Sequence, residues 1–268
     1  MNQSLVNSVK RSPLANSLAL HDFANATYDL KGWVAYTANL FKEYGLKPTM
    51  MGISAPNIKS TKMHTYIREV KKLDMVDNAT ITGITVQATM NGLLDYRDAI
   101  FTATFSIGLK PDVNNCVLTL DNALVPFEKK IWDGLVKKTA SFFKPAYGYG
   151  YRRLYKKGPE SYPSGVSCGM DWDDPEGDLI DCWNKKYRIN SKYCTGDMRD
   201  IYQLNVLSSA HNQRMVDGMT LFDWINADTS RGTLTKVGED LWSWWVKDEE
   251  IDLMRLVLKP TGILLCAP

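Results

Sequence analysis

The segment 101–109, FTATFSIGL, alternates apolar residues with small or polar ones and has the clearest two-residue period in the chain. Because successive side chains of a β-strand point to opposite faces of a sheet, this period predicts a strand with one buried face. The segment 82–90 alternates in the same way, and CVLTL at 116–120 predicts a third strand. Turn signals, NG at 91–92 and PD at 111–112, separate the three segments. They therefore predict three antiparallel strands in a meander.

Apolar residues at helical spacing occur in the sequence both before and after this meander. Apolar residues recur every three or four positions between 30 and 44, after a capping Asp29 and before a terminating Gly45. Segments 61–73 and 126–145 predict two more helices, the second opened by a proline. Strands and helices are grouped rather than strictly alternating, which predicts an α+β fold, an antiparallel sheet with packed helices.

The remaining sequence divides into an irregular and a regular part. Residues 145–200 hold seven glycines and four prolines and are expected to be rich in loops. Regular patterns return from residue 220 to the C-terminus, with a capped short helix, two strands and a closing helix. We expect a single domain over 1–268, which could divide into sub-lobes 1–145 and 200–268 joined by a loop-rich 146–199 segment.

The segment 238–250, GEDLWSWWVKDEE, places three tryptophans within four positions and surrounds them with acidic residues. In a strand, Trp242 and Trp244 share one face and Trp245 lies on the other. Both faces are then bulky, so the strand is either sandwiched in the core or presents one face to a partner. Because large aromatic side chains are highly buried on average, the core is favoured.

Charge and hydropathy exclude several classes of protein. The net charge is +2, so no global field attracts nucleic acid or an anionic membrane. The sequence contains no uninterrupted stretch of about 18 apolar residues, so it predicts no membrane-spanning helix. The N-terminus lacks the compact apolar run of a secretory signal, and we expect a cytoplasmic protein.

The sequence contains no pattern that predicts catalysis, a cofactor or a metal. Five cysteines and three histidines are irregularly spaced, which argues against a zinc site, and reduced thiols are expected in the cytoplasm. The nucleophile elbow, the P-loop and the dinucleotide-binding glycine pattern are absent. A Cys182–His211 catalytic pair can be imagined, but the spacing does not support it. We expect a protein that is not an enzyme.

The segment 171–181, DWDDPEGDLID, is the densest acidic stretch. It could hold Ca²⁺, although the EF-hand pattern fails because its required glycine falls one residue late. It could supply carboxylates for hydrolysis, or it could be a solvent-exposed loop. It could also be an acidic surface that meets a basic partner, with Trp172 as the aromatic anchor.

A basic and aromatic stretch precedes the acidic one. In KPAYGYGYRRLYKKGP, 144–159, four tyrosines alternate with lysines and arginines, a combination that suits single-stranded nucleic acid. A nucleic-acid-binding module that uses residues 144–157 is therefore an alternative interpretation. A structural or protein-binding segment is favoured over it, because one short basic patch lies on a nearly neutral chain.

The C-terminal quarter contains a series of short motifs. They are R-D-x-Y-x-x-N-x-L (Arg199, Asp200, Tyr202, Asn205, Leu207), G-x-T-L-x-x-W-I (Gly218, Thr220, Leu221, Trp224, Ile225), R-G-x-L (Arg231, Gly232, Leu234) and a tryptophan strand (Trp242, Trp244, Trp245). In these residues the region 199–264 resembles the tail of the immunity protein 52 family, from bacterial polymorphic-toxin and type VI secretion systems.

The resemblance implies a non-enzymatic inhibitor that binds a cognate toxin, encoded next to it and in many family members a predicted nuclease. A nuclease has a basic cleft for phosphate, so an acidic loop could imitate its substrate. The candidate contact residues are then those of the acidic stretch and, second, those of the acidic rim at 239–250: Asp171, Trp172, Asp173, Asp174, Glu176, Asp178, Glu239 and Asp240.

Overall fold

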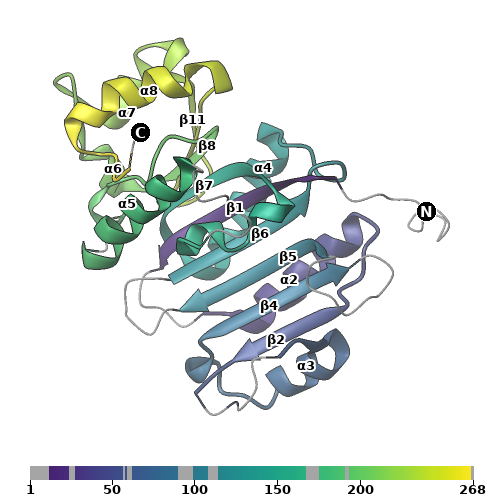
Figure 1. The fold of residues 1–268 in the computed structure, drawn as a ribbon. Coiled ribbons are helices and arrows are strands. Elements are labelled where there is room, and N and C mark those ends of the chain that lie inside the picture. Colours follow the sequence, from purple (N-terminus) through teal and green to yellow (C-terminus); the bar gives the residue numbers. More distant parts are fainter. Residues whose placement is uncertain are drawn as a thin grey trace.

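The structure, a computed structural model, describes residues 12–23, 28–56, 58, 62–89, 99–107, 114–166, 175–190 and 193–266. Within these residues the chain forms a ten-stranded sheet in the order β11-β12-β8-β7-β1-β6-β5-β4-β2-β3, in which every paired strand is antiparallel (Figure 1). Helices pack on both faces of this sheet, so the predicted α+β fold is confirmed.

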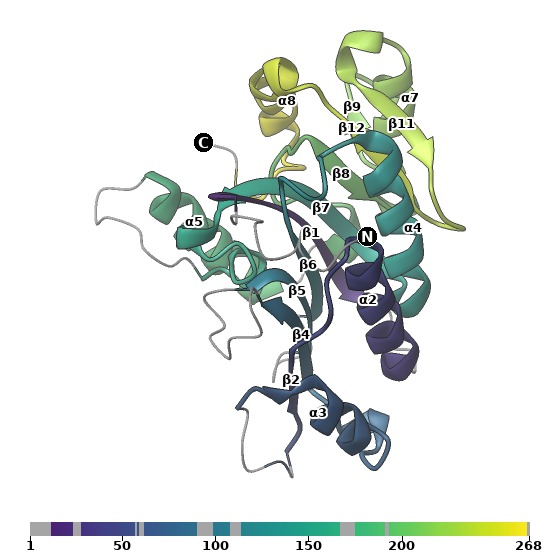
Figure 2. The ribbon, with the colours of Figure 1, turned by 90° about the vertical axis from the view of Figure 1, so that its right-hand side faces the viewer.

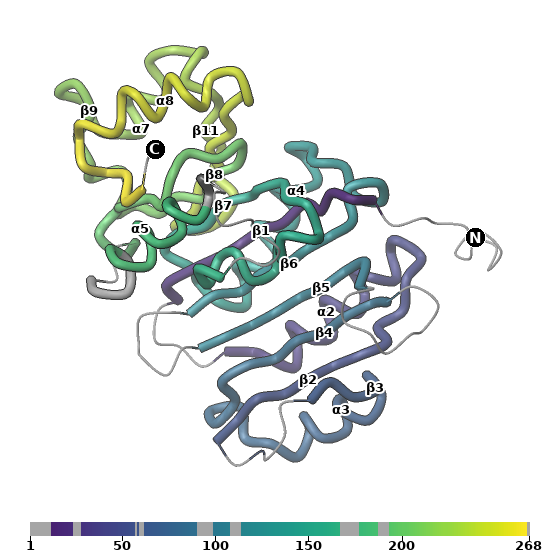
Figure 3. Tube along the Cα trace, in the orientation of Figure 1, coloured from purple at the N-terminus to yellow at the C-terminus, as the bar shows by residue number. Residues whose placement is uncertain are grey.

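The predicted meander is present, although it is only one part of the sheet. Its strands are β4 (Gly83–Thr89), β5 (Ala99–Ile107) and β6 (Asn114–Asp121). Three strands that the sequence does not predict extend it: β2 (Met50–Ser54) and the short β3 (His64–Thr65) lie at one edge, and β1 (Leu14–Phe23) lies on the other side. The trace in Figure 3 shows that β1, the first strand of the chain, lies in the middle of the sheet.

The three predicted helices are found with shifted ends. Helix α2 (Leu30–Glu43) begins after Asp29, whose carboxylate accepts the Gly32 N–H, and Gly45 ends it with a φ of +77°. Helix α3 (Tyr66–Leu73) begins five residues later than predicted, because residues 64–65 pair with β2 instead. Helix α4 (Lys129–Phe143) begins three residues after Pro126.

The prediction that 145–200 is rich in loops is wrong for much of that segment. Residues Pro145–Leu154 form β7, which pairs with β1 on one side and β8 (Leu204–Leu207) on the other. Residues Pro175–Asn190 form helix α5. In β7 the glycines alternate with tyrosines and permit a close approach of the neighbouring strands. A Cβ on Gly148 would lie 2.6 Å from the Ala19 carbonyl oxygen.

We therefore expect Gly148→Ala to lower the free energy of unfolding by about 2–3 kcal/mol, because neighbouring backbone would have to move. Gly134→Ala is the matched control, since no atom lies within 4 Å of its added Cβ in the middle of α4. This control should be neutral or stabilise the protein by up to about 1 kcal/mol. Urea unfolding of both variants measures the difference, and equal effects would contradict the packing described for β7.

Two apolar cores lie on opposite faces of the sheet. Helices α2 and α4 cover one face, where they pack on side chains from β1, β4, β5, β6 and β8. Helix α5 and the C-terminal helices α7 (Leu221–Asn226) and α8 (Ile251–Leu258) contribute to the other core, together with the tyrosines of β7. Figure 2 shows α5 and α8 on the side of the sheet opposite α2 and α4. One sheet thus runs through both predicted sub-lobes, with β7 between them.

The remaining C-terminal elements are short. A helical turn α6 (Ser209–Asn212) and a small hairpin of β9 (Met215–Val216) and β10 (Met219–Thr220) precede α7, whose predicted cap is confirmed by the Asp223 N–H donating to the Thr220 hydroxyl. The hairpin β11 (Thr233–Lys236) and β12 (Trp242–Trp245) forms the edge of the sheet. No helix in the described ranges is long and apolar enough to cross a membrane.

The tryptophan strand β12 is sandwiched between the two cores, as the core interpretation predicted. Trp244 is fully buried in the core on the α5 face, and its indole N–H donates to the Arg231 carbonyl at 2.7 Å. Trp245 points to the other face, where it contacts Phe127 and donates to Asp133. Trp242 is half-buried against Phe222.

Candidate functional site

Four of the eight predicted contact residues lie in the described part of the chain. Asp171, Trp172, Asp173 and Asp174 lie outside the described residues. Glu176 is in the first turn of α5, and Asp178 follows it on the exposed side of that helix. Glu239 and Asp240 are both exposed in the turn between β11 and β12.

Glu239 and helix α5 lie on different faces of the sheet. Glu239 lines a shallow depression of about 520 Å³ together with residues of α4, whereas α5 covers the opposite face (Figure 2). Asp240 accepts hydrogen bonds from the backbone N–H and the hydroxyl of Ser209, at 3.2 and 3.1 Å, and so holds the first turn of α6.

The alternative interpretation requires bases to stack on the tyrosines of 144–157, and burial contradicts this for three of the four. Tyr147, Tyr149 and Tyr151 are on the inner face of β7 and are at most 6% exposed. The Tyr151 hydroxyl donates to the Pro159 carbonyl at 2.5 Å, inside the protein. Bases can stack only on rings that solvent reaches. The tyrosines instead form the floor of the second core.

A buried arginine organises the centre of this core. Arg199 is 3% exposed, and a guanidinium keeps its charge when it is buried. Its guanidinium lies between the rings of Tyr162 and Trp183, at 4.0 and 4.2 Å from their centroids. It donates to the Tyr149 hydroxyl at 2.7 Å and to the Tyr162 carbonyl at 3.0 Å. Ring faces and hydrogen bonds together compensate the charge, as a desolvated cation requires.

The other residues of the R-D-x-Y-x-x-N motif also hold the fold together. Asp200 accepts two hydrogen bonds from Arg255 of α8, at 2.9 and 2.6 Å. Tyr202 stacks on Tyr149 with ring centroids 4.3 Å apart and an interplanar angle of 12°. The Asn205 amide bonds both the N–H and the carbonyl of Tyr202. The residues of this motif therefore connect β7, β8 and α8 within the fold.

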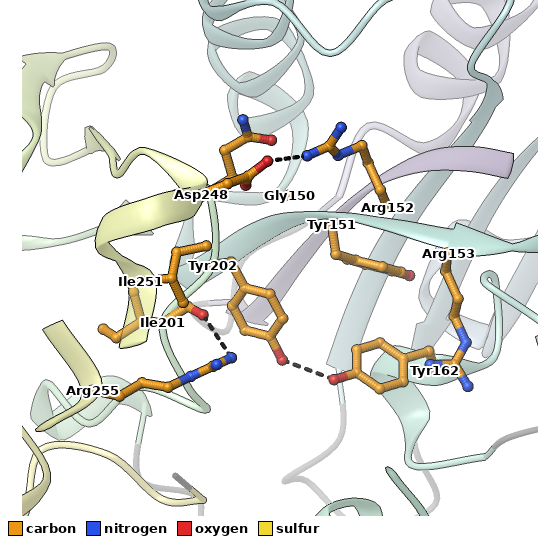
Figure 4. A pocket seen from close by; sticks show the side chains of 11 residues that line it. Gly150, Tyr151, Arg152, Arg153, Tyr162, Ile201, Tyr202, Asp248, Ile251 and Arg255 are labelled. Atoms are coloured by element: carbon orange, nitrogen blue, oxygen red, sulfur yellow. Dashed lines mark hydrogen bonds and ion pairs between the residues drawn. The ribbon is translucent and has the colours of Figure 1, made fainter. Parts of the chain in front are cut away.

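A cavity of about 370 Å³ opens beside these motif residues, and Figure 4 shows the residues that line it. Its walls come from β7, from the segment before β8 and from α8. Three guanidinium groups, two half-buried phenols and one carboxylate line it: those of Arg152, Arg153, Arg255, Tyr162, Tyr202 and Asp248. The hydroxyls of Tyr162 and Tyr202 are 3.0 Å apart. Arg152 forms an ion pair with Asp248 across the mouth.

The buried histidines are poorly suited to acid–base catalysis at neutral pH. Burial, assisted by the charge of Arg199, lowers the pKa of His21 to about 3. Burial lowers the pKa of His211 to about 4. Both rings are fully buried, where His21 stacks on Tyr149 and His211 on Tyr147. An efficient general base has a pKa near the working pH and must reach its substrate.

Among the described cysteines, Cys116, Cys182 and Cys266 form no disulfide. Burial raises the pKa of Cys116 well above its usual value, which disfavours the reactive thiolate. In the described part of the chain no three His, Cys, Asp or Glu side chains come close enough to hold a metal ion. The arginine-lined cavity is thus the candidate site that the structure adds. Sequence reasoning missed it, although Arg152 and Arg153 belong to the basic segment and Tyr202 belongs to the R-D-x-Y motif.

Comparisons with known proteins show a likeness of fold. No protein-family model matches the chain, and no curated protein matches it. Among solved structures, the chain is similar to one described as Pseudomonas aeruginosa T6SS protein PA0821, where T6SS denotes the type VI secretion system. The TM-score is 0.55 at 13% identity, and the match covers 94% of this chain and 73% of the other. A likeness at this identity shows a shared fold.

Proposed function

We propose that this chain is an immunity protein of a type VI secretion system, which binds a cognate toxin and neutralises it by covering its active site or an adjoining surface. The observation that carries the proposal is the likeness of fold over 94% of the chain to a protein described as belonging to such a system. The motifs of 199–264, which resemble the immunity protein 52 family, agree with it.

The surface chemistry is consistent with a protein that binds another protein. Tyrosine and arginine are enriched among the residues that dominate binding energy at protein interfaces, and both line the open cavity beside α8. On α8 itself Leu253 and Leu256 are 47% and 71% exposed. The buried histidines offer no accessible base. Occlusion of a toxin requires such a surface and needs no reactive group on the inhibitor.

The proposal is tested by co-expression with the toxin candidate encoded by the neighbouring reading frame. The expected result is that the toxin alone stops growth and that this chain restores it. A pull-down should recover the toxin with the tagged protein. If a folded and abundant protein leaves the cells fully sensitive to every neighbouring toxin candidate, the proposal is wrong.

The acidic stretch gives a prediction about the contact surface. Replacing Asp171, Asp173 and Asp174 together with lysine should slow association with the toxin about tenfold at low salt, because like charges then oppose the encounter. The difference should shrink at high salt, where the charges are screened. Stopped-flow or surface-binding kinetics at two salt concentrations measures it.

The matched control reverses three exposed acidic residues elsewhere, Glu43, Asp74 and Glu128. This control changes the net charge by the same amount and should slow association much less. If both triple variants associate equally fast at low salt, the acidic stretch is not at the contact surface, although the proposed function would remain.

A further inference from the structure

Helix α5 contacts the C-terminal segment 263–266. The Lys186 ammonium of α5 donates to the Leu265 carbonyl at 2.7 Å. The backbone of the same segment is bonded to the R-D-x-Y motif and the residue before it. The Leu265 N–H donates to the Met198 carbonyl at 2.8 Å, and the Cys266 N–H donates to the Arg199 carbonyl at 3.0 Å. The C-terminal segment is therefore fixed in position beside α5.

This contact brings two thiols together, those of Cys182 and Cys266. Cys182 lies one helical turn before Lys186 in α5, on the same side of the helix, and Cys266 directly follows Leu265. The two thiols form a side-chain hydrogen bond. Both pack in the core on the α5 face, where Cys266 is 5% exposed and Cys182 is half-buried. Neither sulfur has to move far to reach the other.

The two thiols differ in how easily they react with a reagent in solution. The thiolate is the nucleophile in thiol–disulfide exchange, and access of the reagent limits its rate. Burial and the hydrogen bond to Cys182 raise the pKa of Cys266 to about 12, against the opposing charges of Lys186 and Arg199. An oxidant from solution therefore meets the half-buried Cys182 first. Cys116 is no competitor, because it lies in the core on the opposite face.

We propose that Cys182 and Cys266 form a disulfide when the protein meets a disulfide oxidant, and that this bond fastens α5 to the C-terminal segment. The Cys182 sulfur loses its proton to water, attacks one sulfur of the oxidant and expels the other as a thiolate. The Cys266 sulfur then loses its proton, attacks the Cys182 sulfur of this mixed disulfide and expels the second half of the oxidant. Two electrons pass to the oxidant, which becomes two thiols by taking up the two protons.

The bond changes stability according to the redox state of the surroundings. It closes a loop of about 84 residues, and a long loop restricts the unfolded chain strongly. In a reducing compartment the two thiols remain as the structure shows them, and in an oxidising one the bond forms. This inference goes beyond the proposed function and does not depend on it, because its test needs no toxin.

The test treats the reduced full-length protein with oxidised glutathione and identifies linked peptides by mass spectrometry. The expected product has lost two hydrogen atoms and contains a peptide pair joined through Cys182 and Cys266. A glutathione adduct on Cys182 should appear before this product. The urea midpoint of the oxidised protein should lie about 1 M above that of the reduced protein, and dithiothreitol should remove the gain.

Single variants separate the two steps. Cys266→Ser should stop at the glutathione adduct on Cys182, because the second thiol is missing. Cys182→Ser should leave Cys266 largely unmodified, because burial shields it from the oxidant. Cys194→Ser, which changes an exposed cysteine, is the matched control and should form the bond as the unmodified protein does. Circular dichroism of each variant establishes that it is folded.

Three results would overturn the proposal. In the first, the oxidised protein keeps glutathione on Cys182 or does not react, and no link to Cys266 forms. In the second, the link forms but the urea midpoint falls, which would mean that the bond strains the fold. In the third, the folded protein links other cysteines in preference to this pair.

Discussion

Lowering the pH from 7 to 4 is expected to reduce the free energy of unfolding by about 6 kcal/mol through His21 and His211 alone. Burial lowers their pKa values from 6.5 to about 3 and about 4 in the folded protein. Below pH 6.5 the unfolded chain therefore binds protons that the folded protein does not, and each unit of pH costs about 1.4 kcal/mol for each histidine. Above pH 6.5 neither ring contributes to the pH dependence.

Urea unfolding at pH 7, 6, 5 and 4 measures this effect. The unfolding midpoint should fall steadily below pH 6.5, and the fall should become shallower in His21→Gln and His211→Gln. Asp200 acts in the opposite direction at the acid end, because burial raises the pKa of its carboxyl. A midpoint that is constant between pH 7 and pH 5 would show that the two rings are not sealed from solvent, and would contradict the core described around Arg199.

Trp244→Ala is expected to lower the free energy of unfolding by about 3–5 kcal/mol, the usual cost of removing a large buried aromatic side chain. The indole is fully buried, and its loss would also leave the Arg231 carbonyl without its donor. The C-terminal motifs meet at this point, because Arg231 in turn donates to the Trp224 carbonyl. The substitution would therefore disturb the packing of several motif residues at once.

Trp242→Ala is the matched control, since Trp242 lies in the same strand and on the same face but is half-buried. Its loss should cost about 1–2 kcal/mol, in proportion to the smaller area that it buries. Thermal or urea unfolding of the two variants gives the comparison. Equal costs would mean that β12 is not seated between the two cores.

Local patterns in the sequence predicted the elements whose neighbours are close along the chain. The two-residue period of 101–109 and the turn signals around it are sufficient for the meander, since β4, β5 and β6 pair in sequence order. The cap at Asp29 and the glycine at 45 similarly mark the ends of α2. These features depend on backbone geometry and periodicity, which a single sequence shows directly.

The error at 145–154 has a physical cause. The alternation YGYGY is a two-residue period, but glycines at this density also indicate a loop. Their function is to let β1 and β8 approach β7 closely, as the contacts of an added Cβ at Gly148 and Gly150 show. Whether a glycine marks a turn or a crowded strand depends on the neighbouring strands. That information is tertiary and is not present in the local pattern.

The cavity could not be predicted from the sequence for a related reason. Arg152, Tyr202 and Asp248 are about fifty residues apart along the chain and meet only because β7 pairs with β8 and α8 follows β12. The sequence did single out Tyr202, through the R-D-x-Y motif. The structure shows that this residue belongs to both the core and the cavity. Its ring stacks on Tyr149, and its hydroxyl lines the cavity beside that of Tyr162.

Titration of the purified toxin with this protein tests the central claim most directly, that the chain acts by covering a toxin and contributes no reaction of its own. The toxin's activity should fall in proportion to the protein added and should vanish at a fixed molar ratio. The protein incubated with the toxin's substrate alone should leave that substrate unchanged. Full toxin activity at a large excess of folded protein, or turnover of the substrate by the protein alone, would contradict the account.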